Sequence, residues 1–406
     1  MEPQFINYAQ FIIPSLENMA IVQIVVSLLA QPDVKMELKE ILKKVQDKER
    51  EPYVAGCYNF RVIENIIRNR LILLRIPKKL HQEILDFVKP IGLQMIKCFD
   101  MRRWEHYYFY NSIDKGTFHW SSWGTIDKIK TLEHAVFHDN TVSSYPEMLF
   151  EFACHCCCEN LIFDLWNRMT RNQKEKFRSK YTTNFKLPRR RLDYNLISYW
   201  VCILENKLSS FCKHHKFNRR KHSISHNMLK LAISSKSFPA VKYFWRELAK
   251  EERTDYNILR WLAKGVKEYL TGLWQHNCLR WYESQMPSEC TDIVLFLLSQ
   301  LSDQKQQKIV LKTYPEMILK SLYNHWPYNP YFLPTINQMW DYIDANLHMG
   351  IVTIIATEAI ERNTSKVLFG ELWKSTPECI KDRFINSGSN RSKSELLKLV
   401  NMMRGK

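Results

Sequence analysis

The sequence predicts an all-α protein, with an amino-terminal helical region over residues 1–140 and a solenoid of helix-pair repeats over residues 141–406. At most one short β-hairpin is expected. Two observations carry this prediction. Glycine, which tight turns and phosphate-binding loops consume, makes up only 10 of the 406 residues. Apolar residues recur at helical spacing through much of the chain, and from about residue 145 the pattern repeats itself.

The amino-terminal region carries two helical patterns. Residues 34–48, VKMELKEILKKVQDK, place apolar side chains at near-helical intervals with charges between them. In residues 76–99, Pro77 suits the first turn of a helix, and Pro90 is expected to end that helix before a second, short one. Residues 104–123 are rich in aromatic side chains, and IDKG between two β-prone runs predicts the hairpin.

The repeat is clearest between two stretches that each hold an alanine and, 13 residues later, a tryptophan: Ala153 with Trp166, and Ala232 with Trp245. Weaker copies lie in residues 292–307 and 359–381. A polar helix start follows the first copy, at Thr170 with Gln173. The aromatic anchors recur every 33–45 residues or so, which is typical of solenoids whose units bury their apolar faces against their neighbours.

One copy resembles a known family. MLKLAISSKSFPAVKYFW, residues 228–245, resembles the two helices of an ankyrin repeat, although Lys236 stands at the turn where the family has glycine. The matching residues are Leu229, Leu231 and Ala232 in the first helix, and Ala240, Val241, Tyr243, Phe244 and Trp245 in the second. The resemblance implies a degenerate ankyrin-like solenoid over about residues 145–380. The helix pair FACHCCCENLIFDLW is also similar to uncharacterised arthropod proteins, a similarity that implies no activity.

Four cysteines crowd the stretch FACHCCCENL, residues 152–161. On a helix Cys154 and Cys158 share one face while Cys156 projects elsewhere, so one helix offers only two zinc ligands. In the repeat alignment Cys157 lies where an ankyrin-like turn has glycine. We therefore expect these cysteines to pack as small apolar residues, with structural zinc and redox sensing as the alternatives.

A second metal hypothesis uses four residues further along the chain: Cys212, His214, His222 and His226. The two last histidines stand four residues apart, as in the second half of a zinc finger, but the spacing of the first half fits no usual finger. The alternative is a solvated basic loop in which histidines occur by composition.

The formal charge of +17 is concentrated in one region. Residues 183–226 hold ten Lys or Arg against two acidic residues. Within the segment 186–222, the residues expected to meet an anionic partner are Arg189, Arg190, Arg191, Lys213, Lys216, Arg219, Arg220 and Lys221. Three interpretations stay open: a solvated loop face, a nucleic-acid site with His214, His215 and Phe217 stacking on bases, or a site for an acidic protein or import receptor.

The functional expectation follows from these features. No apolar stretch reaches the roughly 20 residues of a membrane span, and the amino terminus lacks the basic start of a secretory signal. We expect a cytoplasmic chain, or a nuclear one if an import receptor reads the basic runs, with no membrane partner. Phosphate-binding and hydrolase motifs are absent, so neither enzyme activity nor a cofactor is expected. The sequence predicts a scaffold that holds a protein partner, and nucleic-acid binding through residues 186–222 is the alternative.

Overall fold

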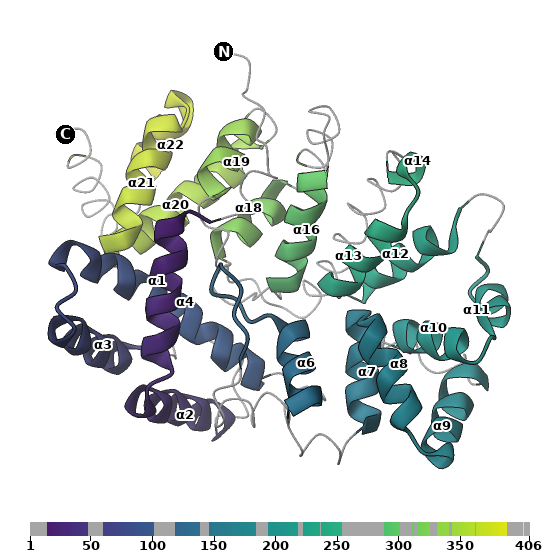
Figure 1. Cartoon of the computed structure of the whole chain (residues 1–406). Helices are drawn as coiled ribbons and strands as arrows, with labels where there is room; N and C mark the ends of the chain where they lie inside the picture. Colours follow the sequence, from purple (N-terminus) through teal and green to yellow (C-terminus); the bar gives the residue numbers. More distant parts are fainter. Residues whose placement is uncertain are drawn as a thin grey trace. The chain divides into compact units, whose positions relative to one another are not determined.

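The computed structural model describes residues 14–47, 60–100, 118–138, 146–183, 194–217, 222–235, 237–253, 288–300, 311, 315–324, 331–340, 343–361, 363–387 and 401. Figure 1 shows helices joined by turns, with no strand in the part of the chain that is described. The prediction of an all-α chain is confirmed there. The chain divides into two compact units, Gln10–Leu297 and Leu298–Lys406 with Met1–Ala9. The division at residue 140 stays a prediction.

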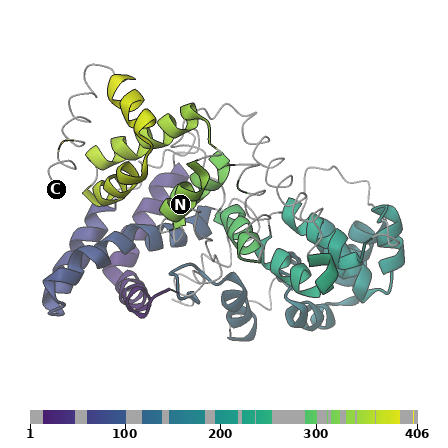
Figure 2. The same ribbon diagram turned by 90° about the horizontal axis from the view of Figure 1, so that it is seen from above.

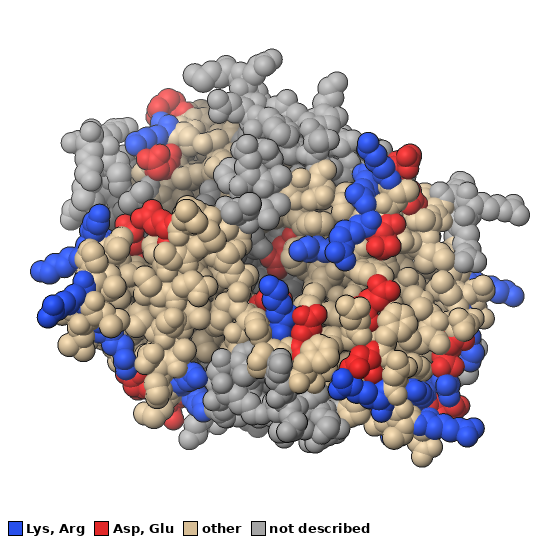
Figure 3. All heavy atoms as spheres, in the orientation of Figure 1, with Lys and Arg blue, Asp and Glu red and all other residues tan. Residues whose placement is uncertain are grey.

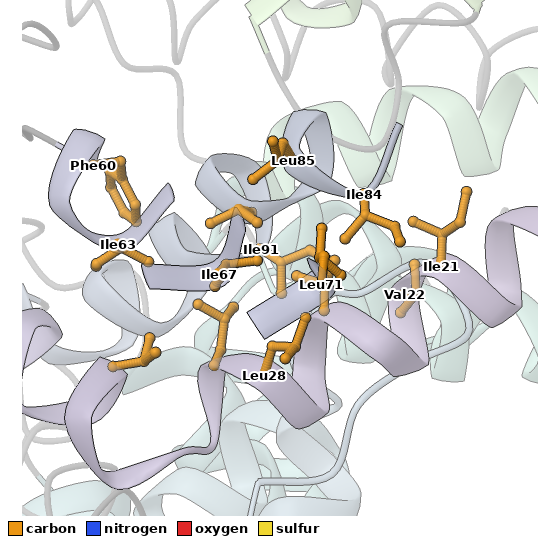
Figure 4. Packing of buried hydrophobic residues seen from close by; sticks show 14 of the residues in the cluster. Ile21, Val22, Leu28, Phe60, Ile63, Ile67, Leu71, Ile84, Leu85 and Ile91 are labelled. Atoms are coloured by element: carbon orange, nitrogen blue, oxygen red, sulfur yellow. The ribbon is translucent and has the colours of Figure 1, made fainter. Parts of the chain in front are cut away.

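Four helices build the first core of the larger unit: α1 (Leu16–Leu29), α2 (Pro32–Asp47), α3 (Arg61–Leu73) and α4 (Lys78–Asp100). Helix α4 packs against the other three. The Ser15 hydroxyl caps α1 by accepting a hydrogen bond from the Asn18 N–H at 3.1 Å. Helix α3 turns Ile63, Ile67 and Leu71 into the core at helical spacing (Figure 4). The amphipathic pattern of residues 34–48 thus correctly predicted α2.

Helix α4 runs through Pro90, so the prediction that this proline ends the helix was wrong. A proline inside a helix removes one backbone hydrogen bond and crowds the preceding turn, at a cost of about 3 kcal/mol. Val88, Ile91 and Met95 are buried in the core on either side of it. Each such buried side chain contributes about 1.5–3 kcal/mol, so packing outweighs the local penalty.

The hairpin predicted over residues 104–123 lies mostly outside the described residues. At its described end, Trp120 pairs with Ile126 in an isolated antiparallel bridge around a tight turn. Gly124 lies in this turn at φ +71°, and a Cβ there would come within 2.8 Å of the Ile91 side chain. The turn needs glycine both for its positive φ and for its close approach to α4.

No single helix among the described residues is long and apolar enough to cross a bilayer. Helix α1 and the start of α2 have the length and composition only when they are taken together, and the chain bends by 81° between them. Five apolar residues of α1, Val25 and Leu29 among them, are buried in the four-helix core, whereas Leu16 at its start is exposed.

Short helices make up the rest of the larger unit and run on into α16: α6 (Lys128–His138), α7 (Pro146–Cys156), α8 (Glu159–Arg168), α9 (Arg171–Arg178), the π-helical turn η3 (Ser179–Thr183), α10 (Tyr194–Leu204), α11 (Leu208–His214), α12 (Ile224–Ser234), α13 (Phe238–Glu247), α14 (Lys250–Arg253) and α16 (Ser288–Gln300). Helix α7 packs on α8 and α12 on α13, as the repeat predicts (Figure 2). Helix α13 also packs on α7, and the Ser237 hydroxyl, 1% exposed, donates to the His155 carbonyl at 2.6 Å. The two helix pairs are therefore joined.

The smaller unit is also helical where it is described: α18 (Pro315–Asn324), α19 (Phe332–Met339), α20 (Ala345–Glu361), α21 (Asn363–Ser375) and α22 (Glu378–Ser387). Helix α20 packs along α21 and against α22, and α18 packs on α19. The Asp344 carboxylate starts α20 by accepting the backbone N–H groups of Asn346 and Leu347.

Three helices end in the same way, with a buried tryptophan in the last turn: Trp166 on α8, Trp245 on α13 and Trp373 on α21. In each copy the residue three positions later donates its backbone N–H to the tryptophan carbonyl at 3.3 Å. The next helix then begins five residues after the tryptophan. The first of these next helices, α9, starts with the predicted Thr170–Gln173 capping box.

In two copies the helix that follows turns a lysine and a phenylalanine back onto the tryptophan. Lys174 Nζ lies 5.8 Å from the centroid of the Trp166 ring, and Phe177 meets that ring edge-on at 6.3 Å. The lysine and phenylalanine at the same offsets from Trp373 lie 6.0 and 5.5 Å from its ring. The repeat is thus a local unit of one tryptophan helix and its successor, and the solenoid stays a prediction.

Four helix ends are closed by a residue other than glycine in the left-handed conformation: Arg75, Cys157, Asn206 and Lys216, with φ of 53–56°. After α7, the Cys158 N–H donates to the Ala153 carbonyl and the Cys157 N–H to the Cys154 carbonyl. The same two-bond closure, a Schellman motif, ends the other three helices. Helix ends that glycine usually closes are therefore formed here without it, which agrees with the low glycine content.

We predict that Arg75→Gly raises the free energy of unfolding by about 0.5–1 kcal/mol, because glycine adopts a positive φ without a steric penalty. The matched control is Arg68→Gly at an exposed site within α3, which should lower the free energy of unfolding by about 1 kcal/mol. Urea unfolding of both variants measures the two effects. A loss of stability in both would show that Arg75 is not strained.

Candidate partner-binding surface

The described part of the basic segment is built on α10 and α11. Helix α10 is closed through Asn206, and the Lys207 N–H donates to the Cys202 carbonyl at 2.7 Å. This closure reverses the chain, and α11 begins at once. Phe211 and Cys212 are buried, so α11 is anchored by one apolar side. Its position is therefore fixed by packing rather than by charge.

The opposite side of α11 is basic and exposed. Lys207, Lys213, His214 and Lys216 are all exposed, and we call these four residues the α11 basic face. Residues 206–217 contain no Asp or Glu. The buried side ends at Cys212, and every exposed position from residue 213 to residue 217 carries a basic side chain. The α11 basic face therefore presents positive charge with no acidic residue close to it in sequence.

Basic side chains on the neighbouring helices form ion pairs within the protein. Arg178 on α9 donates from Nε and Nη2 to both carboxylate oxygens of Glu205, at 2.8 and 3.0 Å. Lys180 donates to Glu151 at 3.0 Å, and the Tyr181 hydroxyl donates to the same oxygen at 2.5 Å. Among the described residues, no ion pair involves a lysine of the α11 basic face. These lysines are therefore available to an external anion.

His215 lies under the α11 basic face rather than on it. Its ring centroid is 4.4 Å from that of Phe211 and 5.7 Å from that of Phe217. Burial, together with the neighbouring His214, lowers the pKa of His215 from 6.5 to about 4. The imidazole is neutral at pH 7 and belongs to a ring cluster. Of the three rings predicted to stack on bases, His214 alone is exposed.

Of the eight residues predicted to meet an anionic partner, the structure describes Lys213 and Lys216, and both are exposed. The other six, Arg189, Arg190, Arg191, Arg219, Arg220 and Lys221, lie outside the described residues. Their assignment stays a prediction.

The second metal hypothesis receives no support from the geometry. The rings of His222 and His226 stack with centroids 4.0 Å apart, whereas Cys212 is buried in α11 and His214 is exposed beside it. Within the described residues, no group of three or more His, Cys, Asp or Glu side chains is placed to hold a metal ion. The structure brings together the two histidines, not the four residues.

The cysteine cluster lies where the first helix pair closes. Cys154, Cys156, Cys157 and Cys158 are 0–9% exposed, and all four are free thiols. Cys157 takes the left-handed conformation, at the position where the ankyrin resemblance places glycine. Burial raises the pKa of Cys154 and of Cys157 well above their ordinary values. Thiols of this kind pack as small apolar groups and are poor nucleophiles.

Sequence reasoning missed the polar contacts that hold this region together. Glu151 meets Lys180 and Tyr181, and Arg178 meets Glu205, across 27–30 residues of sequence. No spacing rule connects partners so far apart. The only available signal was that acidic residues are scarce near the basic segment, so each one present was a candidate for pairing.

We predict that native protein treated with iodoacetamide is alkylated quickly at Cys379, which is exposed, and slowly at the four cysteines of residues 154–158. Mass spectrometry of the digested protein assigns each label to its site. Unfolding in urea is the control, because it should make all five sites react alike. Fast labelling of Cys154 in the native protein would contradict its burial.

We predict that His215 lowers the free energy of unfolding of the protein in acid. Its pKa is lower in the folded chain than in the unfolded one, so the unfolded chain binds the extra proton between pH 6.5 and about 4. Stability from this group is complete above pH 6.5 and is lost as the pH falls through that window. Urea unfolding at pH 7 and pH 4.5 measures the loss, which should be smaller in His215→Phe. Equal losses would assign the pH dependence to other groups.

The ankyrin-like interpretation rests on the sequence alone and stays a prediction. No protein-family model matches this chain, and no curated protein sequence or solved structure is significantly similar to it.

Proposed function

We propose that this chain is a non-enzymatic scaffold of the helical-repeat type that binds an acidic protein partner through the α11 basic face. The single observation behind the proposal is the set of exposed lysines on an anchored helix, with no acidic residue in residues 206–217. A rigid helix presents its charges at fixed spacing, so an acidic partner gains affinity and orientation together.

The repeated helix units support a scaffold rather than a catalyst. The tryptophan-closed helices bury their anchors, and the residue three positions after each tryptophan is buried as well. Such units stack into extended surfaces that suit a long partner. The basic runs at residues 189–191 and 219–221 flank α10 and α11 in sequence and extend the positive charge available to the partner.

Nucleic acid is the second candidate partner for residues 186–222. It needs phosphate contacts from lysine and arginine, and also rings on which bases can stack. The basic residues meet the first requirement. His215 and Phe217 contact Phe211 within the ring cluster, which leaves His214 as the exposed ring. The described geometry therefore favours a protein over a single strand.

We predict that Lys213→Gln with Lys216→Gln abolishes capture of specific proteins by the tagged chain, because the charges that orient the partner are removed. Pull-downs from cell lysate, with and without nuclease, measure this. The matched control, Arg246→Gln with Lys250→Gln, removes two exposed charges from α13 and α14 and should leave capture unchanged.

The nuclease arm separates the two candidates. Proteins that stay bound after nuclease treatment and are lost only in the α11 variant support the scaffold. Bound material that disappears with nuclease, and whose retention falls steeply with salt, assigns the segment to nucleic acid instead.

A further inference from the structure

Helix α3 ends in an exposed apolar corner. Ile72, Leu73 and Leu74 are 59%, 80% and 61% exposed, and we call these three residues the α3 corner. A single exposed leucine is common, but three large apolar residues in a row at the surface leave much apolar area in water. Folding supplies no reason for them.

The way α3 packs on the core explains why the three side chains of the α3 corner are not buried. Helix α3 packs inward through Ile63, Ile67 and Leu71 (Figure 4), and the chain then closes at Arg75. The Ile76 N–H donates to the Leu71 carbonyl at 3.0 Å, and the Ile76 side chain packs against the same core. Leu71 before the corner is thus buried, Ile76 beyond Arg75 is partly buried against the same core, and the corner itself turns outward.

The geometry of the α3 corner restricts what can cover it. Consecutive helical residues point about 100° apart, so three in a row spread over most of the helix circumference. One groove on a partner protein covers a stripe of residues spaced three or four apart, not a run of neighbours. A fluid apolar layer that the helix end enters can surround all three side chains.

The charge around the α3 corner points to the same kind of surface. Residues 65–82 contain five Lys or Arg and no Asp or Glu. Arg70 is paired with Asp33 at 2.7 Å, whereas Arg68, Lys78 and Lys79 are exposed. In Figure 3 Lys and Arg side chains gather at the left margin, where Figure 1 draws the turn from α3 to α4. A basic rim around an apolar tip complements an anionic headgroup layer over hydrocarbon.

We propose that the α3 corner docks the protein onto the surface of a bilayer that contains anionic lipids. Ile72, Leu73 and Leu74 enter the boundary between headgroups and acyl chains, and Lys78 and Lys79 contact lipid phosphates. The expectation of no membrane partner concerned spanning helices, and this contact spans nothing. It also uses none of the α11 basic face, so it stands or fails separately from the proposed scaffold function.

The test is co-sedimentation of the full chain with phosphatidylcholine vesicles that contain roughly one-third phosphatidylserine. Ile72→Ser, Leu73→Ser and Leu74→Ser together keep the charge and should weaken binding at least tenfold, because the apolar contribution is lost. Lys78→Gln with Lys79→Gln should weaken it by about fivefold for each charge. Vesicles of phosphatidylcholine alone should bind wild-type protein far more weakly.

Matched variants separate this surface from a general attraction of a basic chain. Val62→Ser, Phe137→Ser and Phe163→Ser remove three exposed apolar side chains elsewhere, and Lys213→Gln with Lys216→Gln removes two charges elsewhere. Neither should weaken binding as much as the corner variants. Unchanged binding of the triple corner variant overturns the proposal. So does a triple variant that changes the sedimenting mass of the free protein instead, because the corner would then join two copies of the chain.

Discussion

The helix units after residue 145 depend on burying one tryptophan in the last turn of a short helix. Helices of this length are marginal in water by themselves, so their stability has to come from a neighbour. Trp166 supplies the contact area, and the next helix returns a phenylalanine and a lysine to the same ring. In all three copies the residue three positions after the tryptophan donates its N–H to the tryptophan carbonyl. Because this turn is the same each time, the next helix always begins five residues after the tryptophan. The ring and the turn together define one unit.

The left-handed helix ends are the second constraint, and they connect the fold to its surfaces. The closure at Lys216 ends α11 with basic residues outward and apolar ones inward, whereas the closure at Arg75 leaves the apolar α3 corner outward at the end of α3. Both surfaces arise from a helix that stops abruptly, while its inward stripe continues across the turn. Surface chemistry here is set by where each helix ends as much as by which residues it contains.

Sequence reasoning recovered what depends on neighbours in the chain. Helical periodicity found α2, and the alanine-to-tryptophan spacing found α7 with α8 and α12 with α13. It failed at Pro90, because local propensity cannot register the buried residues on either side that hold α4 together. For the candidate surface, it named Lys213 and Lys216 from charge density. It could not predict that Arg178 pairs with Glu205, because this pairing depends on how α9 meets the end of α10.

The hydrogen bonds of the Ser237 hydroxyl determine when the end of α7 can be completed during synthesis of the chain. The hydroxyl caps α13 by accepting the Ala240 N–H, and it donates to the carbonyl of His155, 82 residues earlier in the chain. Helix α7 therefore leaves the ribosome long before Ser237, the residue whose hydroxyl completes the hydrogen bonding of its last turn. During that interval the carbonyl of His155 lacks the hydroxyl that will bind it. Translation speed between the two pairs thus sets how long the end of α7 stays incomplete and open to chaperones.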